Sequence, residues 1–412
     1  MEIRHVLSII TVLSSWAAIG GLSMSLVHLL LVRRHLRGPV PTPAIRPPIS
    51  ILKPLCGLDD RLLQNLATFA DLPYPDYEVL LGVRDMSDAA YETAIAVTRR
   101  WPRRFRVVVQ SGEPGLNPKV NQLMTLVRAA RNEVVVISDS NTRVPPGYLD
   151  EIAAYLQDPG VGLVTHPIAG EGDEQCGARL GAALDNMHLS GGITPGLTAA
   201  KLLCGKDYVV GKSMAMRCAD LRAIGGFGVV KDVLAEDFVL GRLVPERLGK
   251  RVVLARAVVR SVSRRRTIEG FVRRYARWSV MQRQCAGTAA YWGLLLLNPV
   301  LLATLALALR PSALLAAVWL ACAAGRIALD GAAGRALRGR TFAPWALAWA
   351  PCKDLLVAGA WLYGLTNRTI EWRSHRLTVL RGSVLSPELP RLPLRPRRAR
   401  AAPGRGPASA TA

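Results

Sequence analysis

The chain has 412 residues, of which 50% are hydrophobic and 20% charged, and its formal net charge is +23. The basic residues lie beside apolar runs and in the tail after Arg391, a positive-inside pattern that favours a membrane protein over a nucleic-acid-binding one. The seven cysteines are scattered and form no C-x-x-C pair, which argues against a disulfide framework or structural zinc and indicates a reducing compartment.

An apolar run at residues 6–32 begins the chain. It is longer than the ~20 residues that span a bilayer and longer than the ~7–15 apolar residues of a signal peptide. The basic segment Arg33–Arg37 follows it, whereas only Arg4 and His5 precede it. Because the more positive flank stays in the cytosol, we predict a transmembrane anchor at residues 1–37 and a cytosolic domain after it.

Short β-rich runs alternate with helical runs after a proline-rich linker at residues 39–48. We predict strands at residues 49–55, 78–83, 105–110, 134–138 and 161–165, and helices at residues 60–71, 87–101, 117–131 and 146–157. This alternation is typical of an α/β fold in which helices cover both faces of a mostly parallel sheet, here within residues 38–285. In such sheets ligands bind beyond the carboxyl ends of the strands.

Carboxylates follow two of the predicted strands. Asp85 comes after the strand at residues 78–83, and Asp139 comes directly after Ser138, with Ser140 and Asn141 behind it. Such residues are placed in the crevice beyond the strand ends, although an aspartate after a strand is also a common turn former. Either residue alone leaves both interpretations open.

Three further apolar stretches follow, at residues 291–309, 312–329 and 342–365, and they predict three or four spans in total. The last stretch carries Lys353 and Asp354 in its middle. Each charge costs roughly 2.5–3.5 kcal/mol at a helix centre, so we expect a re-entrant or interfacial segment, or one that turns this pair toward a protein cavity. Residues 286–382 are therefore predicted as a membrane or interfacial region, and residues 383–412 as a basic, disordered tail.

Four features occur in order along the chain: Asp85, Asp139-Ser140-Asn141, Glu236-Asp237 and Arg274-Tyr275-Ala276-Arg277-Trp278. Together they resemble the D, D, D, (Q/R)xxRW signature of inverting glycosyltransferases with the GT-A fold, and in particular the ceramide glucosyltransferase family. The resemblance covers residues 49–285 and is carried locally by Ile49–Leu55, Asn117–Asn121, Gly211–Met214 and Ala235–Phe238. Residues 372–381 also look like that family.

The resemblance implies a donor site for a UDP-sugar. Asp85 occupies the position that holds the uracil ring, and Asp139 that of the ligand for a divalent cation, Mg²⁺ or Mn²⁺, which clamps the pyrophosphate. Asn141 stands where the usual D-x-D motif has its second acid, so it offers an amide oxygen or a water contact and predicts weaker metal binding. Lys119, at the start of a predicted helix, is expected to pair with phosphate, and a plain surface lysine is the alternative.

The same resemblance assigns the acceptor side. Asp237 matches the general base that removes the acceptor hydroxyl's proton, and a helix-capping acid is the alternative. Arg277 offers a fork of donors for phosphate and Trp278 a flat wall for a sugar or acceptor. Arg274 stands where processive synthases usually carry Gln, which favours a single transfer to a lipid.

The sequence therefore predicts an integral membrane enzyme, with a bacterial inner membrane as its expected location and a cytosolic catalytic domain. It would transfer a sugar, with glucose as the first guess, from a UDP-sugar to a lipid hydroxyl such as that of ceramide. Two alternatives stay open: a hopanoid (bacteriohopanetetrol) N-acetylglucosaminyltransferase, and a non-enzymatic membrane scaffold with a transferase fold. A processive polysaccharide synthase is disfavoured by the small number of predicted spans and by Arg274. We predict no nucleic-acid partner.

Overall fold

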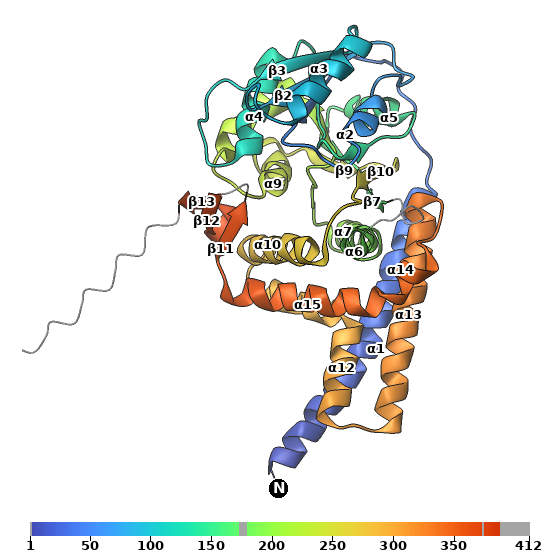
Figure 1. Cartoon of the computed structure of the whole chain (residues 1–412). Coiled ribbons are helices and arrows are strands. Elements are labelled where there is room, and N and C mark those ends of the chain that lie inside the picture. The colour runs from blue at the N-terminus through green and yellow to red at the C-terminus, as the bar shows by residue number, and fades with distance from the viewer. Residues whose placement is uncertain (1, 173–178, 373–374, 388–412) are drawn as a thin grey trace, which may run out of the picture.

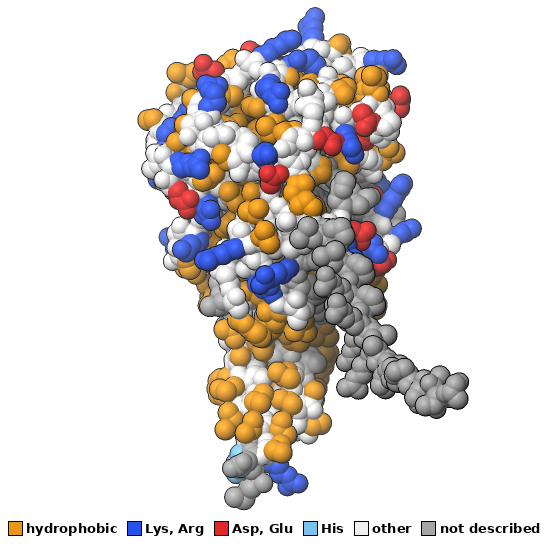
Figure 2. All heavy atoms as spheres, turned by 90° about the vertical axis from the view of Figure 1, so that its left-hand side faces the viewer, with side chains coloured by type: hydrophobic (Ala, Val, Ile, Leu, Met, Phe, Trp, Pro, Cys, Tyr) orange, Lys and Arg blue, Asp and Glu red, His pale blue; other side chains and the backbone are white. Residues whose placement is uncertain are grey.

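The computed structural model describes residues 2–172, 179–372 and 375–387. It places an α/β domain above a stem of long helices (Figure 1). Hydrophobic side chains dominate the surface of the stem, whereas Lys, Arg, Asp and Glu are spread over the domain above it (Figure 2). The apolar stem agrees with the predicted membrane helices.

Among the described residues, seven strands form the main sheet, in the order β3-β2-β1-β4-β8-β6-β9. Neighbouring strands pair in parallel except at β8, which runs antiparallel to β4 and β6. The strands are β1 (Ile49–Pro54), β2 (Tyr77–Val83), β3 (Phe105–Val109), β4 (Val134–Ile137), β6 (Val161–Thr165), β8 (Met214–Arg217) and β9 (Arg251–Leu254). The five predicted strands and the mostly parallel sheet are confirmed, while β8 and β9 were not predicted.

Helices cover both faces of this sheet, as predicted. Successive residues of a strand point to opposite faces, so Ile51 and Leu52 of β1 enter separate hydrophobic clusters. The Ile51 face is covered by α2 (Leu62–Ala67), α3 (Ala90–Arg100) and α5 (Tyr148–Leu156), and the Leu52 face by α4 (Pro118–Ala129), α8 (Cys218–Ala223), η2 (Phe227–Val230) and α9 (Glu236–Leu248).

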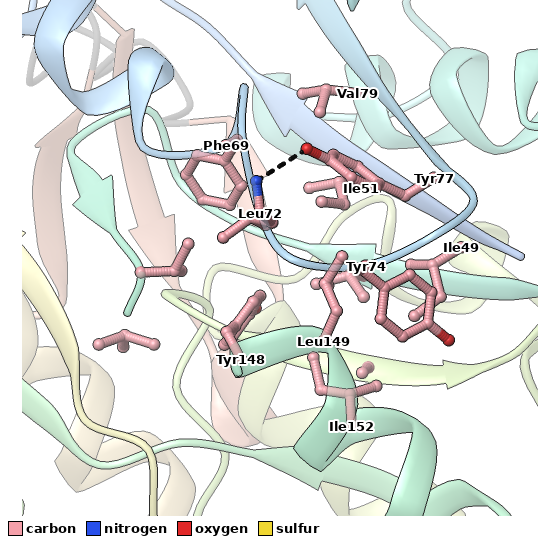
Figure 3. Close-up of a cluster of buried hydrophobic side chains, with 14 of the residues drawn as sticks. Ile49, Ile51, Phe69, Leu72, Tyr74, Tyr77, Val79, Tyr148, Leu149 and Ile152 are labelled. Carbon is pink, nitrogen blue, oxygen red and sulfur yellow. Dashed lines mark hydrogen bonds between the residues drawn. The ribbon is translucent and has the colours of Figure 1, made fainter. Parts of the chain in front are cut away.

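Figure 3 shows the cluster on the Ile51 face. Its one marked polar contact joins the Tyr77 hydroxyl, as acceptor, to the Leu72 N–H at 3.1 Å, and the same hydroxyl donates to the Ala70 carbonyl at 2.8 Å. The buried hydroxyl therefore has a partner both as donor and as acceptor, so burying the tyrosine leaves no polar group without a hydrogen bond.

A small second sheet and a broken helix extend the domain toward the stem. The sheet has the order β5-β10-β7, with β5 (Thr142–Arg143), β10 (Val259–Val262) and β7 (Ile168–Glu171). The helix consists of α6 (Leu180–His188), a π-helical turn η1 (Leu189–Ile193) and α7 (Thr194–Cys204). Asn141 joins the two sheets, because its carbonyl accepts from the Val262 N–H at 2.8 Å.

Two helices of the described chain are long and apolar enough to cross a membrane, α1 (Glu2–Leu36) and α13 (Ala313–Arg338). A third span is present if residues 291–297, which comprise the end of α11 (Thr288–Gly293) and η3 (Leu294–Leu297), form one bent span with α12 (Pro299–Leu309), which they meet at 79°. The predicted number of three or four spans becomes two or three. The chain thus has the architecture of a membrane protein.

The last apolar stretch folds into α14 (Pro344–Ala348) and α15 (Ala350–Thr366). Helix α15 lies across the top of the stem, along α10 (Ile268–Ala286) (Figure 1). Lys353 and Asp354 are buried there against Arg326 and Asp330 of α13. The charged pair of this stretch therefore turns toward protein, which is one of the arrangements predicted for it.

A third sheet follows the membrane region, formed by β11 (Thr369–Trp372), β12 (His375–Val379) and β13 (Leu385–Pro387), with η4 (Arg381–Ser383) before β13. It packs on α10 and returns to the α/β domain, where the Leu385 N–H donates to the Asp232 carbonyl at 2.7 Å. Residues 383–387, assigned above to the disordered tail, therefore belong to the fold. The rest of that predicted tail lies outside the described residues.

Candidate active site

Asp139 lies at the sheet edge where several functional side chains meet. It follows β4, whose Ile137 pairs with Met214 at the start of the antiparallel strand β8. The two residues before that start are therefore brought to the same edge, and Lys212 Nζ lies 2.9 Å from Asp139 Oδ2. Lys212 also donates to Asn141 Oδ1 at 2.6 Å, so it holds both polar residues of the D-S-N turn.

Lys119 reaches the same point from the first turn of α4. Asn117 caps that helix, because its side-chain oxygen accepts from the N–H groups of Lys119 and Val120 at 3.0 and 3.1 Å. Lys119 Nζ then lies 2.9 Å from Asp139 Oδ1 and 2.7 Å from Glu236 Oε1. Its side chain is only 14% exposed, which places it inside the cluster and not on an open surface.

Asp237 is the second residue of α9. Its Oδ2 accepts from the Gly211 N–H at 2.6 Å, and its Oδ1 from the Phe238 N–H at 2.8 Å. A side chain at Gly211 would displace the lysine amine, since a Cβ there would lie 2.5 Å from Lys119 Nζ and 3.2 Å from Asp237 Oδ2. The glycine thus allows the base candidate and the phosphate-binding candidate to approach each other.

The pKa values of Asp237 and Asp139 are shifted in opposite directions. Burial and the neighbouring Glu236 carboxylate raise the pKa of Asp237 to about 6, against the opposing effect of Lys119. Burial acts in the same direction on Asp139, but Lys119 and Lys212 outweigh it and hold the pKa of that carboxyl well below its ordinary value. Asp139 is therefore a permanent anion, whereas Asp237 can exchange a proton near neutral pH.

Lys53 is a member of this site that the sequence analysis did not assign. It is fully buried at the end of β1 and donates to Ser138 Oγ at 3.1 Å and to the Asp139 carbonyl at 2.9 Å, with its amine 3.8 Å from the centre of the Phe69 ring. Burial lowers its pKa to about 7, although Asp139 opposes this. A lone lysine in an otherwise apolar strand, Ile49-Ser50-Ile51-Leu52-Lys53, was the available signal.

The arginines of the fourth motif are carried by α10. Arg274 has a side chain that is only 9% exposed, with its Nη1 3.5 Å from Asp185 Oδ2 and its guanidinium carbon 4.9 Å from the centre of the Trp278 ring. Asp185 also accepts from the Tyr275 hydroxyl at 2.9 Å. Arg277 is half-buried on the same helix. Arg274 and Trp278 therefore form one stacked pair, fixed to α6 through Asp185.

Asp85 stands apart from this cluster. It follows β2, which is separated from β4 by β1 in the sheet order. Its side chain is exposed and accepts from the Ser87 N–H at 2.8 Å and from the Ser87 hydroxyl. The structure therefore brings together Lys119, Asp139, Asn141 and Asp237, and leaves Asp85 in a turn at the rim.

Asp139 and Asn141 offer one carboxylate and one amide oxygen that could coordinate a divalent cation. No group of three or more His, Cys, Asp or Glu side chains that could hold a metal ion exists in the described residues. Mg²⁺ is commonly held by one or two protein oxygens together with substrate phosphates. This donor set fits such a cation, one that arrives with a diphosphate, and does not fit a site closed by protein alone.

The sequence profile of glycosyl transferase family 21 matches residues 13–385 and so includes every residue of this site. The chain belongs to this family. Two relatives of this family 21 chain are ceramide glucosyltransferases 1 and 3 of Caenorhabditis elegans, each 29% identical, over 247 and 238 residues. These matches cover 58% and 56% of the chain, and the chain spans about half the length of these relatives. The predicted resemblance to ceramide glucosyltransferases is confirmed.

Among solved structures, the family 21 fold is similar to a mannosyltransferase from Pyrobaculum calidifontis in complex with GDP-mannose and Mn²⁺. The TM-score is 0.52 at 19% identity, and the match covers 86% of this chain and 99% of the other. At this identity the likeness concerns the fold, and it confirms the predicted glycosyltransferase architecture.

Proposed function

We propose that the protein is an inverting glycosyltransferase that moves a sugar from a UDP-sugar to a lipid hydroxyl, with UDP-glucose and ceramide as the first pair to test. One observation carries the proposal. A carboxylate that titrates near neutral pH, Asp237, lies beside Lys119, and Lys119 also contacts the permanently charged Asp139. A base and a diphosphate-binding group are thus held side by side, as an inverting transfer requires.

The donor side depends on the two lysines. In the structure their ammonium groups neutralise Asp139. A nucleoside diphosphate brings phosphate oxygens that compete for the same ammonium groups, so Lys119 and Lys212 would bind and orient it. Asp139 and Asn141 would hold a divalent cation on that diphosphate, which supplies further positive charge for the leaving group. Asp85, at the rim, is the proposed contact for the uracil ring.

On the acceptor side, Asp237 would take the proton of the attacking hydroxyl. Its Gly211 and Phe238 hydrogen bonds fix the orientation of the carboxylate. Trp278 and Arg274 would form one wall of the acceptor site, and Arg277 would contact phosphate from the same helix. An inverting transfer needs one base only, because the charged donor site stabilises the leaving group.

The position of the site supports a lipid acceptor. Helix α10, which carries Arg274 and Trp278, packs on α15 at the top of the apolar stem (Figure 1). Trp16 is exposed on α1, and three further exposed tryptophans lie on α11, on α14 and directly before α15, namely Trp292, Trp345 and Trp349. Tryptophan is enriched where protein crosses the membrane–water interface, so we place the bilayer surface there. The basic residues in the last turn of α1, Arg33 and Arg34, support a cytosolic catalytic domain, at the inner membrane if the source is bacterial.

The test is product formation by the purified protein in detergent with Mg²⁺ or Mn²⁺. A panel of UDP-sugars is offered against ceramide and bacteriohopanetetrol, and the products are identified by mass spectrometry. A glycosylated lipid of inverted anomeric configuration is the expected result. A retained configuration would refute the inverting mechanism, and folded protein that neither binds UDP nor turns over would favour the scaffold alternative.

The raised pKa of Asp237 predicts the pH dependence of turnover. A base must be unprotonated, so kcat/KM, which reports the free enzyme, should be constant above pH 7 and fall about tenfold per pH unit below pH 6. The measurement is kcat/KM from pH 4.5 to 8.5, with circular dichroism at each pH to confirm that the protein stays folded. A rate that is unchanged at pH 5 would exclude Asp237 as the base.

The donor set also predicts how the cation binds. Since Asp139 and Asn141 provide two oxygens and both contact lysines, Mg²⁺ alone should bind only at millimolar concentrations, and UDP should strengthen its binding at least tenfold. Isothermal titration with Mg²⁺, with and without UDP, measures both. Equal affinity in the two titrations would mean that the cation site does not involve the diphosphate.

A further inference from the structure

Helix α9, which presents Asp237, begins at a residue that cannot cap it. Its N-cap is Ala235, whose side chain has no acceptor. Ser383 instead accepts hydrogen bonds from the backbone N–H groups of the two residues directly before the helix. The Leu234 N–H donates to the Ser383 carbonyl at 2.8 Å, and the Ala235 N–H donates to Ser383 Oγ at 3.1 Å. A residue 148 positions later in the chain therefore performs what a neighbouring side chain does in an ordinary capping box.

The backbone of Ser383 is built for these contacts. Its φ is +64°, in the left-handed region that residues other than glycine rarely adopt, and it follows Gly382 at +74°. The side chain is fully buried and shares a hydrogen bond with the Cys285 thiol of α10. Such a conformation persists when its surroundings over-determine it, and it aims both oxygens of Ser383 at the start of α9.

The loop directly before α9, residues 231–235, also contacts the segment that begins α4. The Leu116 N–H donates to Asp232 Oδ1 at 2.8 Å, and Asn117 Nδ2 donates to the Val233 carbonyl at 2.6 Å. Asn117 is also the cap of the helix that carries Lys119. The loop before Asp237 thus lies between the lysine-bearing helix and the turn that contains Ser383.

We propose that Ser383 is a positioning residue for Asp237. By fixing the direction in which α9 begins, it fixes where the carboxylate of the second helical residue lies relative to Lys119 and Gly211. This inference rests on the proposed role of Asp237 as base. It links the segment after the membrane region to the chemistry of the α/β domain, 148 residues away in sequence.

The experiment compares Ser383→Ala and Ser383→Gly with the wild type. Both remove the hydroxyl, and glycine accepts the left-handed backbone without strain, so S383G retains the fold even if S383A does not. Ser386→Ala is the matched control. Ser386 lies on the following strand, and in the described part of the chain its hydroxyl hydrogen-bonds only to the Pro387 carbonyl. The measurements are kcat, the KM for the donor, the pH profile, and amide hydrogen exchange of residues 234–238.

We expect about tenfold lower kcat at unchanged donor KM in both Ser383 variants. The acid limb of the pH profile should move to higher pH, because a loosened helix start weakens the N–H bonds to Asp237. Exchange of residues 234–238 should be about fivefold faster, the factor a typical cap contributes. S386A should match the wild type in every measurement.

Unchanged exchange and an unchanged pH limb in both Ser383 variants would overturn the proposal. Faster exchange with wild-type kcat and pH profile would overturn it as well, because Ser383 would then only stabilise the fold. If the wild type transfers no sugar to any lipid, the proposed function fails instead. The exchange data, which need no turnover, would still decide whether Ser383 holds the start of α9.

Discussion

Asp237→Asn is expected to lower the rate of sugar transfer by about 10²–10⁴-fold while UDP still binds, because the substitution removes the proton acceptor and keeps its shape. The neighbouring contacts explain why binding survives: Lys119 still meets Asp139 and Glu236. The measurement is kcat for glycolipid formation together with the dissociation constant of UDP.

Glu246→Gln is the matched control for this variant. Glu246 lies on the same helix, is exposed and pairs with Arg242 at the surface. Its substitution should leave both quantities unchanged. Transfer by D237N within tenfold of the wild type would remove Asp237 from the mechanism, and loss of UDP binding in the same variant would assign it to the donor site.

Lys119→Met should have the largest effect on stability. One ammonium group serves Asp139 and Glu236 directly and lies close to Asp237. Its loss leaves the buried Glu236 carboxylate without this ion pair, while Asp139 keeps Lys212. Breaking a buried ion pair on one side costs about 3–5 kcal/mol, and the side chain here is mostly buried. We expect a decrease of that size in the free energy of unfolding at pH 8, with loss of UDP binding.

The loss of stability in K119M should depend on pH. Lys119 opposes the raised pKa of Asp237, so its loss raises that pKa further in the folded state, and protonation of Asp237 then favours folding as the pH falls. The stability deficit should therefore shrink between pH 8 and pH 5. Urea unfolding at both pH values measures it, with the exposed Lys206→Met as control. A second substitution, Glu236→Gln, should restore part of the loss, and K119M as stable as the wild type at pH 8 would contradict this account.

The sequence was sufficient for the parts of the fold that depend on local pattern. The buried Val and Ile runs of β1, β2 and β4 have no competing interpretation, and each ends where predicted to within one residue. Strand β8 was missed because its four residues carry a short pattern, and its antiparallel direction depends on pairing with β4 and β6. Its direction nevertheless decides that Lys212 reaches Asp139.

The candidate site was predicted as a set of residues but not as an arrangement. The motifs named Lys119, Asp139 and Asp237, and the structure brings these together. The shared lysine, the support from Lys53 and the contact of Ser383 with α9 all join segments distant in sequence, and no local pattern encodes such pairings. Asp85 is the opposite example: it belongs to the motif set in the sequence, but in the structure it lies apart from the cluster around Asp139.

The buried charges between α13 and α15 bear on how the chain can enter a bilayer during synthesis. Arg326 and Asp330 pair one turn apart on α13, and Lys353 and Asp354 are adjacent on α15. In the middle of each helix one positive charge is therefore paired with one negative charge, and α13 carries its two further arginines, Arg335 and Arg338, in its last turn. The Arg326–Asp330 pair of α13 is thus compensated before α15 has been made, and the later docking of the two helices exchanges partners within a neutral group of four charges.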